Sequence, residues 1–221
     1  MVDSEHTNET YTQPLNVALF ASGGGTDANA ILEANGKGLI IDGRVVLLVS
    51  TKEDVGCIDV GHRHGVETVV VPKQKLKKDF EPEVVRILKD RAIDLVFLVG
   101  CIHKIPILPG VPTYNIHPAD TIQHGGKGMY GLRVHQSVLQ KIKNEMEDDI
   151  ERGTGRWFTW ITIHEVNEHY DEGEPFVRVA VEVFPDRDDE MTLQRRVLQY
   201  EWMILPTAVN MAIRRIRIAR S

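Results

Sequence analysis

The stretch LNVALFASGGGTD, residues 15–27, predicts the start of an α/β fold. Its first seven residues are mostly apolar and rich in strand formers, which is typical of a buried parallel strand. Three glycines follow at once, and Thr26 or Asp27 is a plausible N-cap for a helix over 28–35. This order of strand, loop and helix presents backbone N–H groups to an anion, although a tight turn without a ligand explains the glycines equally well.

The same order repeats along the chain. Strands that alternate with helices indicate βαβ units, so we predict a mainly parallel, Rossmann-like sheet with helices on both faces. An antiparallel extension should follow near the C-terminus, and a last helix over 191–217 that Pro206 bends or divides. We expect one domain over 15–221 after a disordered leader over 1–14. The other expected elements are strands 44–50, 67–71, 94–100, 158–166 and 176–184, helices 55–64, 80–91 and 132–143, an irregular loop 120–131 and a solvent-facing excursion 144–156.

Composition excludes several classes of protein. The formal charge of -6 over 221 residues, with no strongly basic block, argues against a nucleic-acid partner. Cys57 and Cys101 are too few for a disulfide framework and indicate a reducing compartment. No apolar run approaches the roughly 20 residues that a membrane span needs. We therefore predict a cytoplasmic protein without a membrane partner or a bound metal.

The most informative short motif is Tyr114-Asn115-Ile116-His117-Pro118. Alternation along a strand places Asn115 and His117 on the same side, and Pro118 should end that strand. The two polar groups would then lie at a strand's carboxyl end, where open α/β sheets bind ligands. A satisfied Asn and His at a strand–loop junction is the plainer alternative.

Three features occur in series: the glycine loop, Asn115-Ile116-His117-Pro118, and Asp171-Glu172-Gly173 in a turn between two later strands. This series resembles the 10-formyltetrahydrofolate-dependent formyltransferases over about 16–211. It is most similar to the branch that formylates the amine of glycinamide ribonucleotide in de novo purine biosynthesis. The stretches GGKGMYG at 125–131, ITIH at 161–164 and VNEHYDEG at 166–173 add to the resemblance.

The resemblance implies a role for each site residue. Formyl transfer needs a donor for the oxyanion, a group that carries a proton and a carboxylate that orients them; Asn115, His117 and Asp171 are the catalytic candidates. The cosubstrate would be 10-formyltetrahydrofolate and the partner a phosphorylated small molecule, in a monomer or homodimer. Substrate-binding candidates are Gly23, Gly24, Gly25, Thr26 and Glu201; folate-binding candidates are Ile102, His103, Lys104, Ile105, Val166, Asn167 and Tyr170; weaker candidates are His124, Lys127 and His135.

One departure keeps the substrate open. Thr26-Asp27 stands where the family usually has Ser-Asn, and a carboxylate near a phosphate is unfavourable unless it faces away or caps a helix. The alternatives are a formyltransferase for another amine such as a nucleotide sugar, a formyltetrahydrofolate hydrolase, and a binding module without activity.

Overall fold

The computed structural model describes residues 13–148 and 155–221. The predicted leader, except its last two residues, and part of the predicted excursion (149–154) lie outside this range. Among the described residues no helix is long and apolar enough to cross a membrane. The elements in chain order are β1 (Leu15–Ala21), α1 (Thr26–Gly36), β2 (Gly43–Ser50), α2 (Gly56–Arg63), β3 (Glu67–Val70), α3 (Lys73–Leu76), the 3-10 turn η1 (Lys77–Asp79), α4 (Phe80–Asp90), β4 (Leu95–Leu98), β5 (Thr113–His117), α5 (Thr121–His124), α6 (Leu132–Asp148), β6 (Trp157–Glu165), β7 (Pro175–Val183) and α7 (Glu190–Arg220).

The strands form one sheet in the order β3-β2-β1-β4-β5-β6-β7. The first five strands in this order pair parallel, and β6 and β7 add to the sheet antiparallel. The mainly parallel Rossmann-like sheet with an antiparallel extension is thus confirmed. The order of the strands turns at β1: β2 and β3 lie on one side of it, and β4 to β7 lie on the other. The loops that follow β1 and β4 meet at this point, where the Ser22 N–H donates to the Gly100 carbonyl at 3.1 Å.

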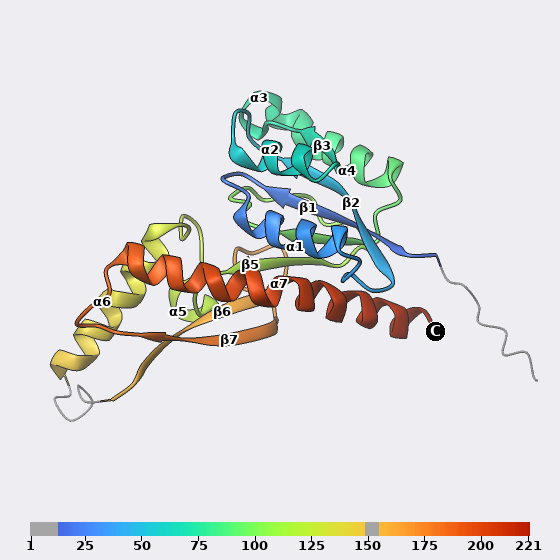
Figure 1. Cartoon of the computed structure of the whole chain (residues 1–221). Helices are drawn as coiled ribbons and strands as arrows, with labels where there is room; N and C mark the ends of the chain where they lie inside the picture. Colours follow the sequence, from blue (N-terminus) through green and yellow to red (C-terminus); the bar gives the residue numbers. More distant parts are fainter. Residues whose placement is uncertain (1–12, 149–154) are drawn as a thin grey trace, which may run out of the picture.

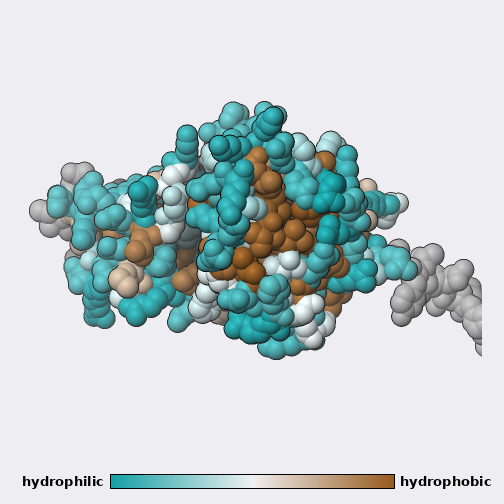
Figure 2. Space-filling model, turned by 90° about the horizontal axis from the view of Figure 1, so that it is seen from above, coloured by the Kyte–Doolittle hydropathy of each residue, from teal (hydrophilic) through white to brown (hydrophobic). Residues whose placement is uncertain are grey.

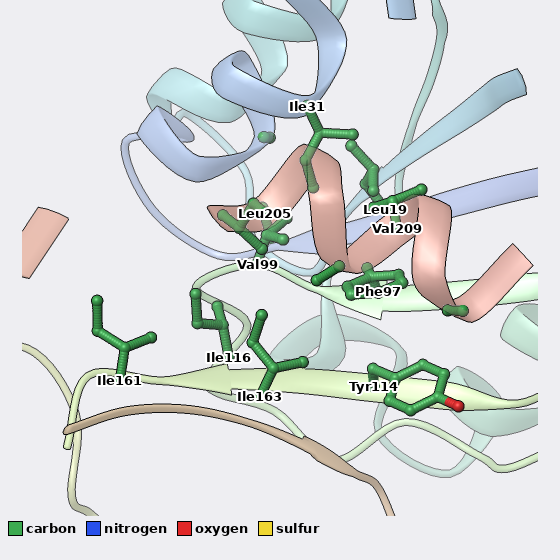
Figure 3. Close-up of a cluster of buried hydrophobic side chains, with 14 of the residues drawn as sticks. Leu19, Ile31, Phe97, Val99, Tyr114, Ile116, Ile161, Ile163, Leu205 and Val209 are labelled. Atoms are coloured by element: carbon green, nitrogen blue, oxygen red, sulfur yellow. The ribbon is translucent and has the colours of Figure 1, made fainter. Parts of the chain in front are cut away.

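Two apolar clusters cover the two faces of the sheet. Along β1, Val17 and Leu19 pack toward α1 and α7, whereas Ala18 and Phe20 pack toward α4. Because both faces are buried, the strand is apolar from Val17 to Ala21 instead of alternating. Figure 3 shows the first cluster, in which Leu205 and Val209 of α7 lie over the sheet. Figure 1 shows α1 and α7 side by side on this face.

Several local predictions were wrong at helix ends. Gly25, not Thr26 or Asp27, is the N-cap of α1, and no side chain caps this helix. The loop over 120–131 contains the short helix α5, because the Asp120 side chain accepts from the N–H groups of Ile122 and Gln123. The helix over 132–143 continues to Asp148, into the predicted excursion.

Pro206 does not divide the last helix, since α7 is a single helix of 31 residues. A proline removes one backbone hydrogen bond, which packing on both sides of it offsets. Leu193 and Val197 before it, and Ala208 and Val209 after it, are fully buried. Asp189 and Thr192 form a capping box at its start.

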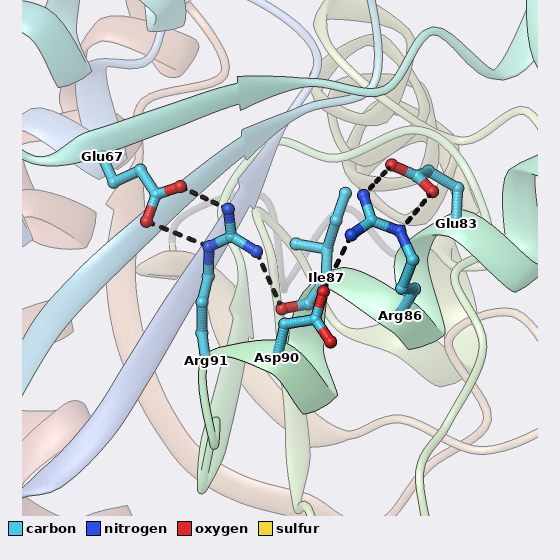
Figure 4. A network of polar contacts seen from close by, with 6 residues as sticks. All are labelled: Glu67, Glu83, Arg86, Ile87, Asp90 and Arg91. Carbon is cyan, nitrogen blue, oxygen red and sulfur yellow. Dashed lines mark hydrogen bonds and ion pairs between the residues drawn. The ribbon is translucent and has the colours of Figure 1, made fainter.

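One charge pair joins the β3 edge of the sheet to the end of α4, and two more lie within α4. Arg91, just after α4, pairs with Glu67 of β3 and donates to the Ile87 carbonyl, while Arg86 pairs with Glu83 and Asp90 (Figure 4).

Figure 2 shows the molecule from above, which is the side on which α2, α3 and β3 lie in Figure 1. On this face an apolar area is surrounded by hydrophilic residues.

Candidate active site

A cavity of about 820 Å³ opens beside the ends of β4 and β5. A volume of this size is in the range of small-molecule sites. Its wall combines the loop after β4, the end of β5, the glycine-rich loop 126–131, the turn 166–171 and part of α7. The catalytic candidates Asn115, His117 and Asp171 all line it. Residues that lie 56 positions apart in the chain therefore meet around one space, as the sequence predicted.

The Asn115 side chain has two hydrogen-bond acceptors. Its Nδ2 lies 3.1 Å from His164 Nε2 and 3.3 Å from Asp171 Oδ1. The neighbouring strand places His164 there, because Asn115 and His164 are direct partners in the β5–β6 pairing. His164 Nδ1 lies 3.0 Å from the Glu165 carbonyl, to which it can only donate, so Nε2 of a neutral ring is free to accept from Asn115. His164 thus orients the amide.

The hydrogen bonds of His117 assign its tautomer. Nε2 lies 3.0 Å from the His124 carbonyl oxygen, which can only accept, so Nε2 carries a hydrogen. In the neutral ring the lone pair is then on Nδ1, which lies 3.8 Å from Asp171 Oδ2. Burial lowers the pKa of His117, and the nearby Asp171 charge opposes this shift. His117 is therefore a neutral base whose Nδ1 faces the carboxylate.

Asp171 sits in a strained turn. Its φ of 57° is in the left-handed region, and the Gly126 N–H donates to its Oδ2 at 2.9 Å. Gly173 is required for the same turn, since a Cβ there would lie 1.5 Å from the Glu165 carbonyl oxygen. Burial raises the pKa of Asp171, but three contacts together bring it below its ordinary value: a hydrogen bond from His164 and the charge of His117, both of which require the protonated rings, and the Gly126 N–H. Asp171 is therefore ionised at neutral pH.

All seven folate-binding candidates line the same cavity. They come from two segments of its wall, 102–105 and 166–170. Lys104 links the segments: its Nζ lies 2.6 Å from the Glu168 carbonyl oxygen and 4.6 Å from the centre of the Tyr170 ring. Their proposed role in folate binding stays a prediction.

The first glycine loop lies at the border of the cavity. Gly23 to Thr26, for which phosphate binding is predicted, are not among the lining residues, whereas the adjacent Asp27 and the predicted Glu201 are. Gly25 has a φ of 79°, and a Cβ on it would lie 2.6 Å from the Cys57 Cα, so only glycine fits between α1 and α2. Gly23 and Gly24 have open space around them, which leaves their backbone accessible to a ligand.

Asp27 and Glu201 are two buried carboxyl groups. Burial raises the pKa of Asp27 to about 6, and the side chain of Trp202 lowers it in part. Burial also raises the pKa of Glu201 well above its ordinary value, and the charge of Asp27 adds to this shift. The folded protein therefore holds a carboxylate at Asp27 at neutral pH at the expense of stability.

We expect Asp27→Asn to stabilise the protein by about 2–3 kcal/mol at pH 7.5, since the pKa rises from 3.8 to about 6 and each unit corresponds to about 1.4 kcal/mol. The free energy of unfolding that wild type loses by ionising Asp27 grows as the pH rises from 3.8 to about 6 and is constant above. The extra stability of Asp27→Asn should therefore shrink as the pH falls toward 4. Urea unfolding at both pH values measures it. Asp59→Asn, at an exposed residue in the first turn of α2, is the control. Equal stability of Asp27→Asn and wild type at pH 7.5 would contradict this account.

Sequence analysis missed the contribution of His164. Ile161 and Ile163 face the apolar core, so alternation along β6 places His164 on the opposite face, the face of Asn115. Among the weaker candidates, Lys127 and His135 line the cavity, whereas His124 does not. His135 is buried on α6, and its Nδ1 has no hydrogen-bond partner among the described residues. Burial lowers the pKa of His135 to about 4.

Comparisons with known proteins find relatives in the family that the sequence resembles. Phosphoribosylglycinamide formyltransferase, chloroplastic, of Arabidopsis thaliana is 35% identical over 84% of this chain and 61% of its own. The protein of the same name from Vigna unguiculata is 32% identical over 88% of this chain and 59% of its own, so the chain spans about three fifths of these relatives. The crystal structure of glycinamide ribonucleotide transformylase 1 from Symbiobacterium toebii superposes with a TM-score of 0.75 at 25% identity, over 91% of this chain and 89% of that one.

The family comparison covers most of the chain. Residues 15–209 match the description Formyl transferase, from β1 into α7, and include each predicted catalytic and binding residue. The chain belongs to the formyl transferase family.

Proposed function

We propose that this protein transfers the formyl group of 10-formyltetrahydrofolate to the amine of glycinamide ribonucleotide. The observation that carries the proposal is the meeting of Asn115, His117 and Asp171 on the wall of one cavity large enough for both substrates' reacting ends. The names of the plant relatives and of the superposed structure support the choice of amine.

Asn115 would stabilise the charge that develops on the formyl oxygen. When the amine attacks the formyl carbon, the carbonyl oxygen becomes an oxyanion that an N–H donor stabilises. Both acceptors of the Asn115 amide are at present protein groups, and the 3.3 Å contact with Asp171 is the longer one. We expect the hydrogen directed at Asp171 to turn to the substrate, while His164 keeps the other.

His117 would carry the proton. The attacking amine must lose a proton as its bond to carbon forms, and the Nδ1 lone pair of His117 can accept it. The resulting imidazolium would face Asp171 Oδ2, whose negative charge stabilises it. The nitrogen of tetrahydrofolate takes up a proton as the carbon–nitrogen bond of the intermediate breaks, and His117 would return it.

A direct assay tests the function. The protein is incubated with 10-formyltetrahydrofolate and glycinamide ribonucleotide, and release of tetrahydrofolate is followed together with the formylated product. We expect turnover that requires both substrates. Turnover no higher than that of Asn115→Ala would refute the proposal.

The carboxylate of Asp27 on the cavity wall favours testing other acceptors as well. A nucleotide-sugar amine and water, the acceptor of a formyltetrahydrofolate hydrolase, belong in the same assay. Preference for either over glycinamide ribonucleotide would reassign the substrate but keep the folate cosubstrate. The compartment stays a prediction: the sequence suggests the cytoplasm, whereas the two plant relatives are named chloroplastic.

We expect the acid limb of kcat/KM, a fall of about tenfold per pH unit, to lie at a pH below 6.5. Burial lowers the pKa of His117, so the neutral form that accepts a proton persists below the ordinary histidine range and is lost as the pH falls through the shifted value. A pH–rate profile at low substrate concentration measures this limb. A limb centred above pH 7 would contradict the role of a neutral, buried His117.

A further inference from the structure

A carboxylate near an anion site can cap a helix or face away, and either arrangement reduces its repulsion of the anion. Asp27 has neither arrangement. It does not cap α1, because Gly25 is the N-cap and no side chain caps this helix. It does not face away either, since it lines the cavity and is only 9% exposed. Its Oδ1 is buried without a hydrogen-bond partner among the described residues. A buried polar atom on a cavity wall calls for a partner from the ligand.

The groups around Asp27 do not neutralise it. Glu201 and the indole of Trp202 face it from α7, and Cys57 of α2 packs against the neighbouring Gly25. The pKa shift of Asp27 comes from burial and from Trp202, and that of Glu201 from burial and from the charge of Asp27; no Lys or Arg of the described residues contributes to either. An anion that binds here therefore meets one carboxylate directly.

Resting on the proposed function, we propose that Asp27 is a specificity residue that takes up a proton when the phosphate of the amine substrate binds beside the first glycine loop. Two negative charges at about 4 Å repel by about 1 kcal/mol in water and by several times as much where water is excluded. A proton from solvent removes this repulsion without any covalent step. It also turns Oδ1 from an orphan acceptor into part of a carboxylic acid whose O–H donates to a phosphate oxygen.

Equilibrium binding tests the proposal without folate and without turnover. Isothermal titration calorimetry with glycinamide ribonucleotide is run from pH 6 to 8.5 in buffers that differ in protonation enthalpy. The proteins are wild type, Asp27→Asn, Glu201→Gln and the exposed control Asp59→Asn. The ligand phosphate also titrates near pH 6, so the Asp27→Asn titration supplies the correction for it.

At pH 7.5 wild type and Asp59→Asn should take up close to one proton more than Asp27→Asn. The Kd of wild type should rise about tenfold between pH 6.5 and 7.5 relative to that of Asp27→Asn, because free Asp27 is ionised above about pH 6 and must be protonated again. At pH 8 Asp27→Asn should bind at least tenfold more tightly than wild type. In Glu201→Gln the uptake should persist.

Equal proton uptake by wild type and Asp27→Asn overturns the inference, and so does absence of binding to both. Uptake that is lost in Glu201→Gln but kept in Asp27→Asn also overturns it, since the proton then goes to Glu201. Binding with the expected uptake but without formyl transfer in the activity assay leaves the inference standing and refutes the proposed function instead.

Discussion

Replacing Asp171 by Asn should lower kcat about 10³-fold while leaving the fold intact. Proton transfer by a positioned group contributes roughly 10²–10⁴ to rate, and Asp171 supplies the charge that stabilises protonated His117. Asn tolerates the left-handed backbone at φ 57° and keeps an oxygen for the Gly126 N–H, so the free energy of unfolding should change by less than about 1 kcal/mol. Steady-state kinetics and urea unfolding on the same samples separate the two effects.

The pH profile distinguishes a catalytic role of Asp171 from a structural one. Asp171 raises the pKa of His117 against the effect of burial, so the residual activity of Asp171→Asn should keep its plateau to a lower pH than wild type. Glu172→Gln, at the exposed neighbour in the same turn, is the control and should behave as wild type. An Asp171→Asn variant with unchanged kcat, or with an acidic limb at the wild-type position, would remove Asp171 from the mechanism.

Replacing Asn115 by Ala should lower kcat by 10²–10³-fold with a small change in KM. Loss of one oxyanion donor typically raises the barrier by about 2.7–4 kcal/mol, and the interaction forms only as charge develops on the formyl oxygen. Single-turnover rates with saturating substrates measure the chemical step directly.

The control for Asn115→Ala is Asn144→Ala, at an exposed position of α6 whose side chain accepts a hydrogen bond from Gln140. It should retain the wild-type rate. An increase in KM with unchanged kcat in Asn115→Ala would show that the amide binds the substrate equally in ground and transition states, and would contradict an oxyanion role.

The fold was predictable because its signals are local. Apolar runs such as Leu15–Ala21, followed by a glycine loop and a helix, indicate a buried parallel strand wherever they occur. Helix ends were less predictable, since they depend on contacts outside the helix. Residue 25, the N-cap of α1, must be glycine because α2 packs so closely against it, and α7 continues through Pro206 because its packing extends on both sides.

The candidate site was predictable only where a motif marks it. Asn115 and His117 lie two residues apart on one strand, and Pro118 ends that strand, so their common direction follows from backbone geometry. Nothing local in the sequence shows that His164 orients Asn115. That contact arises from the register of β5 against β6, a long-range pairing that bridges 49 positions.

By itself the sequence determined the order of strands and helices, the amide and imidazole at the end of β5, and the resemblance of the whole series to formyl-transferring enzymes. Only the tertiary structure decided which nitrogen of His117 is free and which neighbour holds Asn115. It also decided that no Lys or Arg of the described residues offsets the charge of Asp27 beside Glu201. The physical reason is that alternation and propensity act within a few residues, whereas hydrogen-bond partners and burial depend on which distant segments pack together.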